Sequence, residues 1–263
     1  MATRAARSLR HEYGLYIEQE IENYKESIPR SAILAIGDEA AAKLASEPQF
    51  VLTELLLLEE VDKIIFKRLR LPKYETWRRK RMKLHDEMRR PEHWGLHADD
   101  AVVRTIAASS AQSSGHVLLA GDSAERSALF LAANGCEVTA LENEEDAVER
   151  VMNAAIQAGL AERVHAMTTD LTDFLPQSPL HAVVCSHSAL DSLTQADRDR
   201  VIEVLQSATR DGGVHLVETI VAGSAAIDEL RARYAGWSIS IEEDRAHAQV
   251  FFARKDAENS VSH

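Results

Sequence analysis

Residues 116–142 read HVLLAGDSAERSALFLAANGCEVTALE, and this stretch decides the fold of the chain. It begins with an apolar strand, turns at Gly121, continues as an apolar helix and ends in a second strand that closes on Glu142. This order is typical of the nucleotide-binding half of a doubly wound α/β domain. A glycine at the first turn lets a ligand approach the backbone closely. A carboxylate at the tip of the next strand can accept both hydroxyls of a ribose.

The alternation of strands and helices continues to the end of the chain. Strands are expected at 116–120, 137–141, 163–167, 181–186, 213–220, 237–242 and 248–254, and helices at 99–111, 124–134, 144–158, 194–208 and 224–234. Only a short polar loop separates the last two strands, so we expect them to form an antiparallel hairpin. The predicted fold class is therefore α/β, with a Rossmann-like seven-stranded sheet and a C-terminal antiparallel hairpin.

Residues 1–97 have a different pattern, because their apolar residues recur at helical spacing between prolines. We expect an all-helical N-terminal region there, acting as a lid over the second domain or as a dimerisation module through its apolar stripe at 50–69. Residues 98–255 form the α/β domain, and residues 256–263 form a polar tail that we expect to be disordered. The chain of 263 residues is long enough for this two-part organisation.

The net charge of −12 is unevenly distributed. Residues 98–263 carry 12 Lys and Arg against 26 Asp and Glu, which argues against a broad nucleic-acid surface and favours a small-molecule substrate. Residues 63–90 have 12 basic and 3 acidic residues. They predict either an RNA or anionic-substrate surface or, as we favour, a helix pair that docks on the acidic domain of this chain or of a partner subunit.

No apolar run approaches the roughly 20 residues that a membrane span requires, and the N-terminal segment has no apolar core of a secretory signal. Cys136 and Cys185, the two cysteines, both lie in apolar strand-like surroundings, so we expect buried, reduced thiols. Together these features predict a cytoplasmic protein.

Several segments resemble those of one known family, in the right order along the chain. They are Trp94-Gly95-Leu96, residues 129–142 (LFLAANGCEVTALE), residues 206–214 (QSATRDGGV), residues 229–237 (ELRARYAGW) and residues 252–255 (FARK). Through them, residues 92–255 resemble class I S-adenosylmethionine-dependent methyltransferases and are specifically similar to the tellurite-resistance methyltransferase family. The hairpin-closed sheet predicted above is also the arrangement of that class.

The resemblance implies S-adenosylmethionine as the cofactor and assigns roles in its site. The turn from Gly121 to Ala124 wraps the methionine part, with Asp122 near its amino group. Glu142 holds the ribose, while Asp170 and the backbone of Leu171 address the adenine. The segment that begins at Cys185 borders the methyl group. The full set of implied cofactor-binding residues is Gly121, Asp122, Ser123, Arg126, Glu142, Asn143, Asp170, Leu171, Cys185 and Ser186.

The glycine loop departs from the family pattern, which is acidic-x-Gly-x-Gly-x-Gly. Here the key positions are Leu119, Gly121, Ser123 and Glu125. If the Glu125 carboxylate lies about 4 Å from the carboxylate of the cofactor, their repulsion costs about 4 kcal/mol of binding free energy at an effective dielectric near 20. Arg126 can offset this repulsion, or Glu125 can point to solvent.

His187 is the candidate general base, because it follows a strand end and histidine suits proton removal near neutral pH. The alternative is an ordinary surface histidine. Likewise, Gly121 can be a simple turn, Glu142 a solvated strand end and Asp170 the cap of a short helix at 171–174. No cluster of residues has metal-ligand spacing, so no metal is expected.

Three hypotheses for the function remain. We favour methyl transfer from S-adenosylmethionine to a small-molecule acceptor, in a chain that can form a homodimer through its N-terminal helices. A catalytically silent binding or scaffold protein with the same fold is the alternative, favoured by Ser123 and Glu125. An RNA methyltransferase that uses the basic helices at 63–90 is a second alternative.

Overall fold

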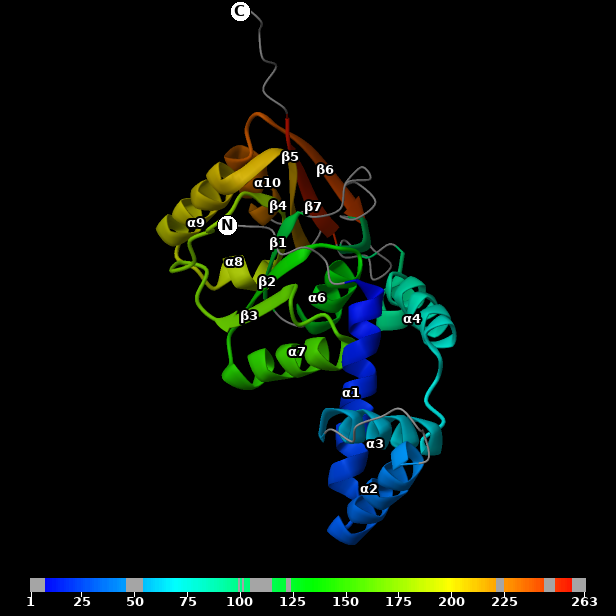
Figure 1. Ribbon diagram of the computed structural model, residues 1–263. Helices are drawn as coiled ribbons and strands as arrows, with labels where there is room; N and C mark the ends of the chain where they lie inside the picture. Colours follow the sequence, from blue (N-terminus) through cyan, green and yellow to red (C-terminus); the bar gives the residue numbers. More distant parts are fainter. Residues whose placement is uncertain are drawn as a thin grey trace, which may run out of the picture. The chain divides into compact units, whose positions relative to one another are not determined.

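The computed structural model in Figure 1 describes residues 8–45, 54–98, 100, 102–104, 115–121, 124–220, 225–243 and 249–256. The chain forms two compact units, Met1–Leu84 and His85–His263. The second unit thus begins ahead of the boundary expected between His97 and Ala98. The reason lies in its packing: Met88 is buried in the α/β core, and the Trp94 indole donates a hydrogen bond to the Met88 carbonyl at 2.6 Å.

In the described part of the chain the first unit consists of helices, as expected. They are α1 (Leu9–Ser27), α2 (Arg30–Ala45), α3 (Glu54–Arg68) and α4 (Tyr74–Met88), the last of which continues into the second unit. Apolar residues from α1, α2 and α3 form its core, namely Ile21, Ile36, Ala40, Val61, Ile64 and Ile65. These residues recur at three- and four-residue spacing, so each helix buries one stripe and leaves the rest to solvent.

Aromatic side chains join the two ends of this unit. Tyr13 and Tyr16 of α1 have ring centroids 5.4 and 6.1 Å from that of Trp77 in α4, and Tyr13 also meets Tyr74 at 5.4 Å. The Tyr13 hydroxyl donates to the carbonyl of Pro72 at 3.0 Å, just before α4 begins. The aromatic residues of α1 are therefore structural contacts within the helical unit.

The second unit is built on a seven-stranded sheet with the order β3-β2-β1-β4-β5-β7-β6. The strands are β1 (His116–Ala120), β2 (Glu137–Glu142), β3 (Val164–Thr168), β4 (Leu180–Ser186), β5 (Thr209–Ile220), β6 (Trp237–Glu243) and β7 (Gln249–Lys255). The first five strands pair with one another in parallel, whereas β7 pairs antiparallel with both β5 and β6. The predicted parallel sheet with a C-terminal antiparallel hairpin is confirmed.

Helices cover both faces of this sheet (Figure 1). They are α6 (Ala124–Ala133), α7 (Glu145–Ala158), α8 (His187–Asp191), α9 (Gln195–Ala208) and α10 (Ala225–Arg233), preceded by the short 3-10 helix η1 (Pro91–Trp94). Side chains alternate along a strand, so Val117 and Leu119 pack with α6 and α7, while Leu118 and Ala120 pack with α8, α9 and α10. Of the helix expected at 99–111, residues 102–104 are helical, and its other positions largely lie outside the described residues.

A series of buried hydrogen bonds lies in the core near β5. Thr209 Oγ1 donates to the Leu205 carbonyl at 2.7 Å, so it accepts from Nε2 of His215 at 2.7 Å. Nδ1 of His215 is then the acceptor for the Tyr234 hydroxyl, at 2.8 Å. This arrangement requires a neutral imidazole, and burial lowers the pKa of His215 to about 3, with Lys255 as a second cause.

Candidate functional site

The carboxyl ends of β1, β2, β3 and β4 meet at one edge of the sheet, where open α/β sheets bind ligands. In the sheet register Ala120 lies beside Leu141 and beside Cys185, and Glu142 lies beside Thr168. The residues that follow these strand ends are therefore neighbours, although they are far apart in the sequence. The structure brings Gly121, Glu142, Asp170 and Ser186 to this edge.

Gly121 makes the turn after β1 with a φ of +111°, a conformation that other residues rarely adopt. A Cβ atom on Gly121 would collide with Ser186 Oγ and lie 2.8 Å from Ser186 Cβ. Only a glycine therefore allows β1 and β4 to end so close together. Asp122 and Ser123, two expected cofactor residues, lie outside the described part of the chain.

The helix after this turn, α6, has Glu125 and Arg126 in its first turn. The Glu125 side chain is half-buried and that of Arg126 is exposed. An Arg126 guanidinium nitrogen lies 3.6 Å from the point where Gly95 would carry a Cβ. Gly95 has a φ of +70° and ends η1, so the expected aromatic-Gly-Leu element lies against the start of α6.

Glu142 is the last residue of β2 and is only 8% exposed, so it is not an ordinary solvated strand end. Asn143 follows it and is exposed, immediately before α7. A carboxylate can accept hydrogen bonds from both hydroxyls of a ribose. The position of Glu142 thus suits the role that the resemblance implies.

Asp170 follows β3 and is exposed. Its Oδ1 accepts hydrogen bonds from the Thr172 amide at 3.0 Å and from the Thr172 hydroxyl at 3.1 Å, which fixes a turn over 171–173. A turn rather than the short helix follows this residue, and Leu171 is buried in the core beneath it. The carboxylate has local hydrogen bonds and remains accessible to a ligand.

The carboxyl end of β4 and the start of α8 place neighbouring side chains in two environments. Ser186 caps the five-residue helix α8, accepting a hydrogen bond from the Ala189 amide at 3.3 Å, and its hydroxyl meets Ser188 Oγ at 2.8 Å. The thiol of the preceding Cys185 is buried in the core, and burial raises its pKa to about 12. Of the three positions Cys185, Ser186 and His187, only the last two have side chains near the surface.

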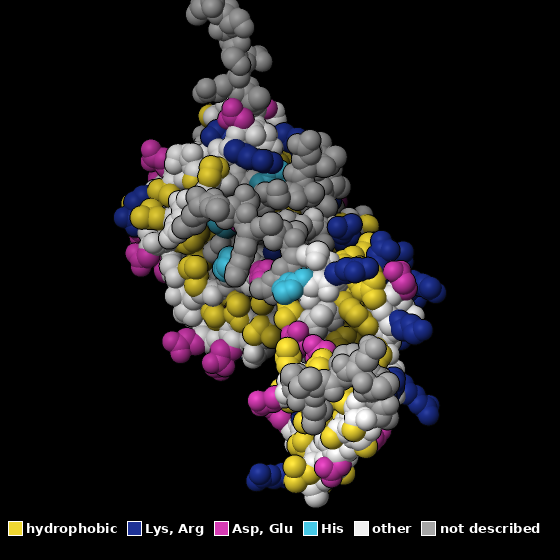
Figure 2. All heavy atoms as spheres, in the orientation of Figure 1, with side chains coloured by type: hydrophobic (Ala, Val, Ile, Leu, Met, Phe, Trp, Pro, Cys, Tyr) yellow, Lys and Arg dark blue, Asp and Glu magenta, His cyan; other side chains and the backbone are white. Residues whose placement is uncertain are grey.

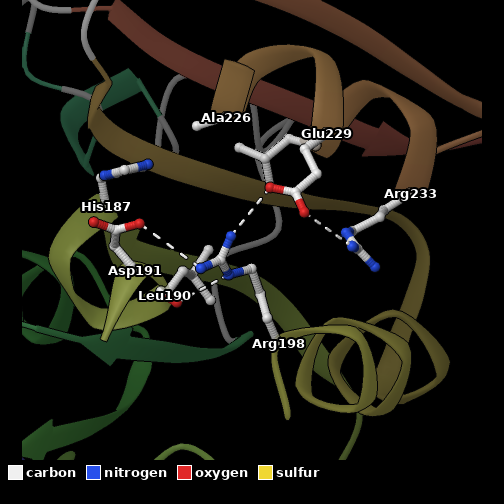
Figure 3. A pocket seen from close by; sticks show the side chains of 8 residues that line it. His187, Leu190, Asp191, Arg198, Ala226, Glu229 and Arg233 are labelled. Carbon is white, nitrogen blue, oxygen red and sulfur yellow. Dashed lines mark hydrogen bonds and ion pairs between the residues drawn. The ribbon is translucent and has the colours of Figure 1, made fainter. Parts of the chain in front are cut away.

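His187 lines a small, shallow hollow (Figure 3). Its other walls come from α8, α9 and α10, and they are Leu190, Asp191, Arg198, Ala226, Glu229, Leu230 and Arg233. The sequence interpretation placed His187 at a strand end but did not include these partners. The four-residue spacing of Glu229 and Arg233 signalled a helical ion pair, whereas nothing in the sequence indicated that Arg198 would join it.

Neither a metal site nor a membrane-spanning helix is found among the described residues. No group of three His, Cys, Asp or Glu side chains among them is arranged to hold a metal ion. None of the helices within the described ranges is both long enough and apolar enough to cross a bilayer.

Comparison with known proteins agrees with this architecture. Residues 96–244 match the family described as "Tellurite resistance protein TehB". Among solved structures, TehB from Haemophilus influenzae is similar with a TM-score of 0.50 and 18% sequence identity, over 61% of this chain and 63% of that chain. The chain therefore spans less than two thirds of the length of that relative.

Two further structures have slightly lower TM-scores. The glycopeptide N-methyltransferase MtfA, solved with (S)-adenosyl-L-methionine, has a TM-score of 0.48 and 16% identity, over 60% of this chain and 88% of that chain. A structure described as "Conversion of a Disulfide Bond into a Thioacetal Group during Echinomycin Biosynthesis" has a TM-score of 0.47 and 26% identity, over 61% of this chain and 82% of that chain. No curated protein sequence matches the chain.

Proposed function

The chain belongs to the tellurite resistance protein TehB family and has the class I methyltransferase fold, and we propose that it methylates a small-molecule acceptor. S-adenosylmethionine is the cofactor of this family and fold. The observation that carries the proposal is the glycine turn at Gly121, where the ends of β1 and β4 approach each other closely. The buried Glu142 carboxylate ends the neighbouring strand β2, and Asp170 follows β3, the next strand in the sheet.

The described residues fit an adenosyl ligand at this edge. Because position 121 has no side chain, Ser186 Oγ occupies the place of its Cβ, and the turn after β1 lies directly against the end of β4. Leu119, which replaces the acidic residue of the family pattern, is 3% exposed and packs in the core instead of facing a ligand. Because Leu119 has no carboxylate, the amino group of the cofactor has one partner fewer. Binding of the cofactor then depends more strongly on Glu142 and Asp170.

In this proposal, some residues at this edge bind the cofactor and another removes a proton from the acceptor. When bound, the cofactor supplies a methyl group that is attached to a positively charged sulfur and is therefore open to attack. Glu142 and Asp170 hold the adenosine end, which fixes the distance and line of attack. We assign to His187, at the hollow next to Ser186, the role of accepting the proton that a hydroxyl, thiol or amine acceptor loses.

Calorimetry with S-adenosylhomocysteine, the demethylated product, tests the proposal directly. We expect a dissociation constant in the micromolar range, on the order of −8 kcal/mol. Asp170→Ala and Glu142→Ala should both weaken binding, whereas Glu137→Ala, at the opposite end of β2, should leave it unchanged. If neither S-adenosylmethionine nor its product binds the wild-type protein, the methyltransferase assignment is wrong.

A catalytically silent binding protein is the alternative that two observations favour. Ser186 Oγ lies in the space above Gly121, and Glu125 is half-buried at the start of α6. Binding of the cofactor without any loss of its methyl group, in the presence of diverse thiol, hydroxyl and amine acceptors, would support this alternative. Turnover of S-adenosylmethionine that His187→Gln lowers by about 100-fold, within the usual range for a general base, would exclude it.

The basic residues of α4 favour a second alternative, an RNA acceptor. Arg78, Arg79 and Lys80 are exposed on this helix, and Figure 2 shows Lys and Arg side chains gathered over it. RNA binding that weakens steeply with salt, and that charge reversal at Arg78 and Arg79 abolishes, would support an RNA methyltransferase. Binding that is insensitive to these changes would exclude this use of α4.

We also propose that the helical unit mediates a homodimer. Leu55 and Leu58 of α3 are 67% and 53% exposed, and adjacent exposed leucines on one helix favour a protein contact. Sedimentation velocity should show a dimer that Leu55→Lys with Leu58→Lys converts to a monomer. A wild-type monomer at tens of micromolar would contradict the proposal.

A further inference from the structure

Arg198 lies at the centre of a network of alternating charges that connects three helices (Figure 3). From α9 it contacts Glu229 of α10 at 3.1 Å and Asp191 of α8 at 3.7 Å. Glu229 is shared with Arg233 at 3.2 Å, and Arg233 in turn pairs with Asp199 of α9. The chain of charges thus runs from α8 through α9 to α10 and returns to α9.

Arg198 also caps the end of α8. Its Nε donates to the Leu190 carbonyl at 3.0 Å and one terminal nitrogen donates to the Leu193 carbonyl at 3.4 Å. The last carbonyls of a helix have no partner within the helix, so a five-residue helix depends strongly on groups from outside. The side chain of Arg198 is only 18% exposed, unlike the surface ion pairs that contribute little.

The helix held in this way carries both residues that face the proposed site. Successive side chains on a helix point about 100° apart. Ser186, the cap of α8, accordingly lies against Gly121, while His187, its first residue, lines the hollow. A shift of α8 would therefore change the cofactor crevice and the position of His187 at the same time.

We propose that Arg198 is a positioning residue, which fixes α8 against α9 and α10 and thereby sets the places of Ser186 and His187. This inference rests on the proposed function, because it concerns the geometry of that site. The planar guanidinium is needed, since it donates to two carbonyls and to Glu229 at once. A lysine can keep the ion pair, but its donors all lie on one compact nitrogen and cannot reach all three acceptors as the guanidinium fork does.

Hydrogen exchange and calorimetry on four proteins test the inference. We compare the wild type, Arg198→Gln, Arg198→Lys and the control Arg200→Gln, which removes a 61% exposed arginine from the same helix α9. In Arg198→Gln the amides of Ser192 and Leu193, which donate to α8 carbonyls, should exchange about tenfold faster, equivalent to about 1.4 kcal/mol. Affinity for S-adenosylhomocysteine should fall by a similar factor.

Arg198→Lys separates positioning from charge alone. We expect it to restore the thermal midpoint towards that of the wild type, while Ser192 and Leu193 still exchange fast. Arg200→Gln should match the wild type in both measurements. The double variant Arg198→Gln with Glu229→Gln should weaken product binding by less than the two single effects combined, because the two residues act as a pair.

In the exchange measurements, any of three results would overturn the inference: unchanged exchange of α8 in Arg198→Gln, full recovery of α8 protection in Arg198→Lys, or an equal loss of protection in the Arg200→Gln control. The exchange measurement needs no ligand. If the wild type binds no cofactor but Arg198→Gln still loosens α8, the proposed function fails while the structural link stands. If the cofactor binds and Arg198→Gln leaves its affinity unchanged, the inference alone fails.

Discussion

Ser186 and Gly121, 65 positions apart in the chain, share a single space at the carboxyl edge of the sheet. The serine hydroxyl lies where a side chain on position 121 would have to be, and the same serine caps α8. One contact therefore joins the turn after β1 to the helix that carries His187. If the proposed site is correct, cofactor binding at Gly121 and the position of His187 depend on the same contact.

Gly121→Ala should destabilise the protein and abolish cofactor binding. A φ of +111° costs an alanine on the order of 1–3 kcal/mol, and the collision with Ser186 adds to this. Gly236→Ala is the matched control, because Gly236 has a φ of +88° but nothing within 4 Å of its added Cβ. Urea unfolding should show a larger loss for Gly121→Ala than for Gly236→Ala. Equal losses of unfolding free energy in the two variants would mean that Ser186 moves aside without a measurable cost.

Ser186→Gly in the Gly121→Ala background should recover the part of the loss that the collision causes. Glycine is a tolerated N-cap that costs only a few tenths of a kcal/mol relative to serine, so the cost to α8 itself is small. The same urea experiment measures the recovery. No recovery in the double variant would show that backbone strain alone limits position 121.

Glu142→Gln should weaken S-adenosylhomocysteine binding by about 10- to 100-fold, because a hydrogen bond to a charged acceptor contributes roughly 1.5–3 kcal/mol. The loss should be much smaller for the 2′-deoxy analogue of the ligand, which lacks one of the two hydroxyls. Calorimetry with both ligands measures the difference. Glu137→Gln is the control, since it lies at the exposed beginning of the same strand. Identical losses with both ligands would argue against a ribose contact.

Stability should decrease as the pH falls below about 6.5, in part because of His215. Burial lowers its pKa in the native protein to about 3, while the unfolded chain binds this proton at about 6.5. Between these values the unfolded state holds one more proton, so His215 removes up to about 1.4 kcal/mol of stability per pH unit. Its contribution is fully present above about pH 6.5 and is lost as the pH falls towards 3.

Urea unfolding of the wild type and His215→Gln between about pH 7.5 and pH 5 measures this contribution. Burial also lowers the pKa values of His116 and His181, so both proteins retain some pH dependence of the same sign. The variant should be less stable at neutral pH and should have a shallower slope. Parallel slopes for the two proteins would show that His215 does not bind the extra proton on unfolding.

Both cysteines should resist alkylation in the native protein. Burial raises the pKa of Cys136 to about 11 and that of Cys185 to about 12, which leaves almost no reactive thiolate at pH 8. Mass spectrometry after iodoacetamide treatment should show no modification in buffer and two modifications in urea. Rapid labelling of native Cys185 would mean that its thiol faces the crevice and not the core.

Much of the fold could be read from local patterns. The strand at 116–120, the glycine turn and the helix that follows were predicted to within one residue, because apolar runs, a glycine and helical spacing occur within a few positions of one another. The hairpin of β6 and β7 was predicted for the same reason, since the short loop between them permits only antiparallel pairing.

Helix α8 was not predicted, because five residues that begin directly at the end of a strand have no periodicity to detect. The role of Arg198 was equally hidden: its partners Leu190, Leu193 and Glu229 are brought to it only when α8, α9 and α10 pack on the same face of the sheet. The closeness of Gly121 to Ser186 depends on β1 and β4 becoming neighbours.

The sequence by itself therefore determined the order and type of the elements, the hairpin and the positions of Gly121, Glu142, Asp170 and Ser186 at strand ends, since these depend on short-range backbone preference and apolar spacing. Only the tertiary structure decided that Ser186 fills the space over Gly121, that Glu142 is buried and that Arg198 holds α8. Those are contacts between residues distant in the chain, and they form only after the hydrophobic faces of the elements have packed together.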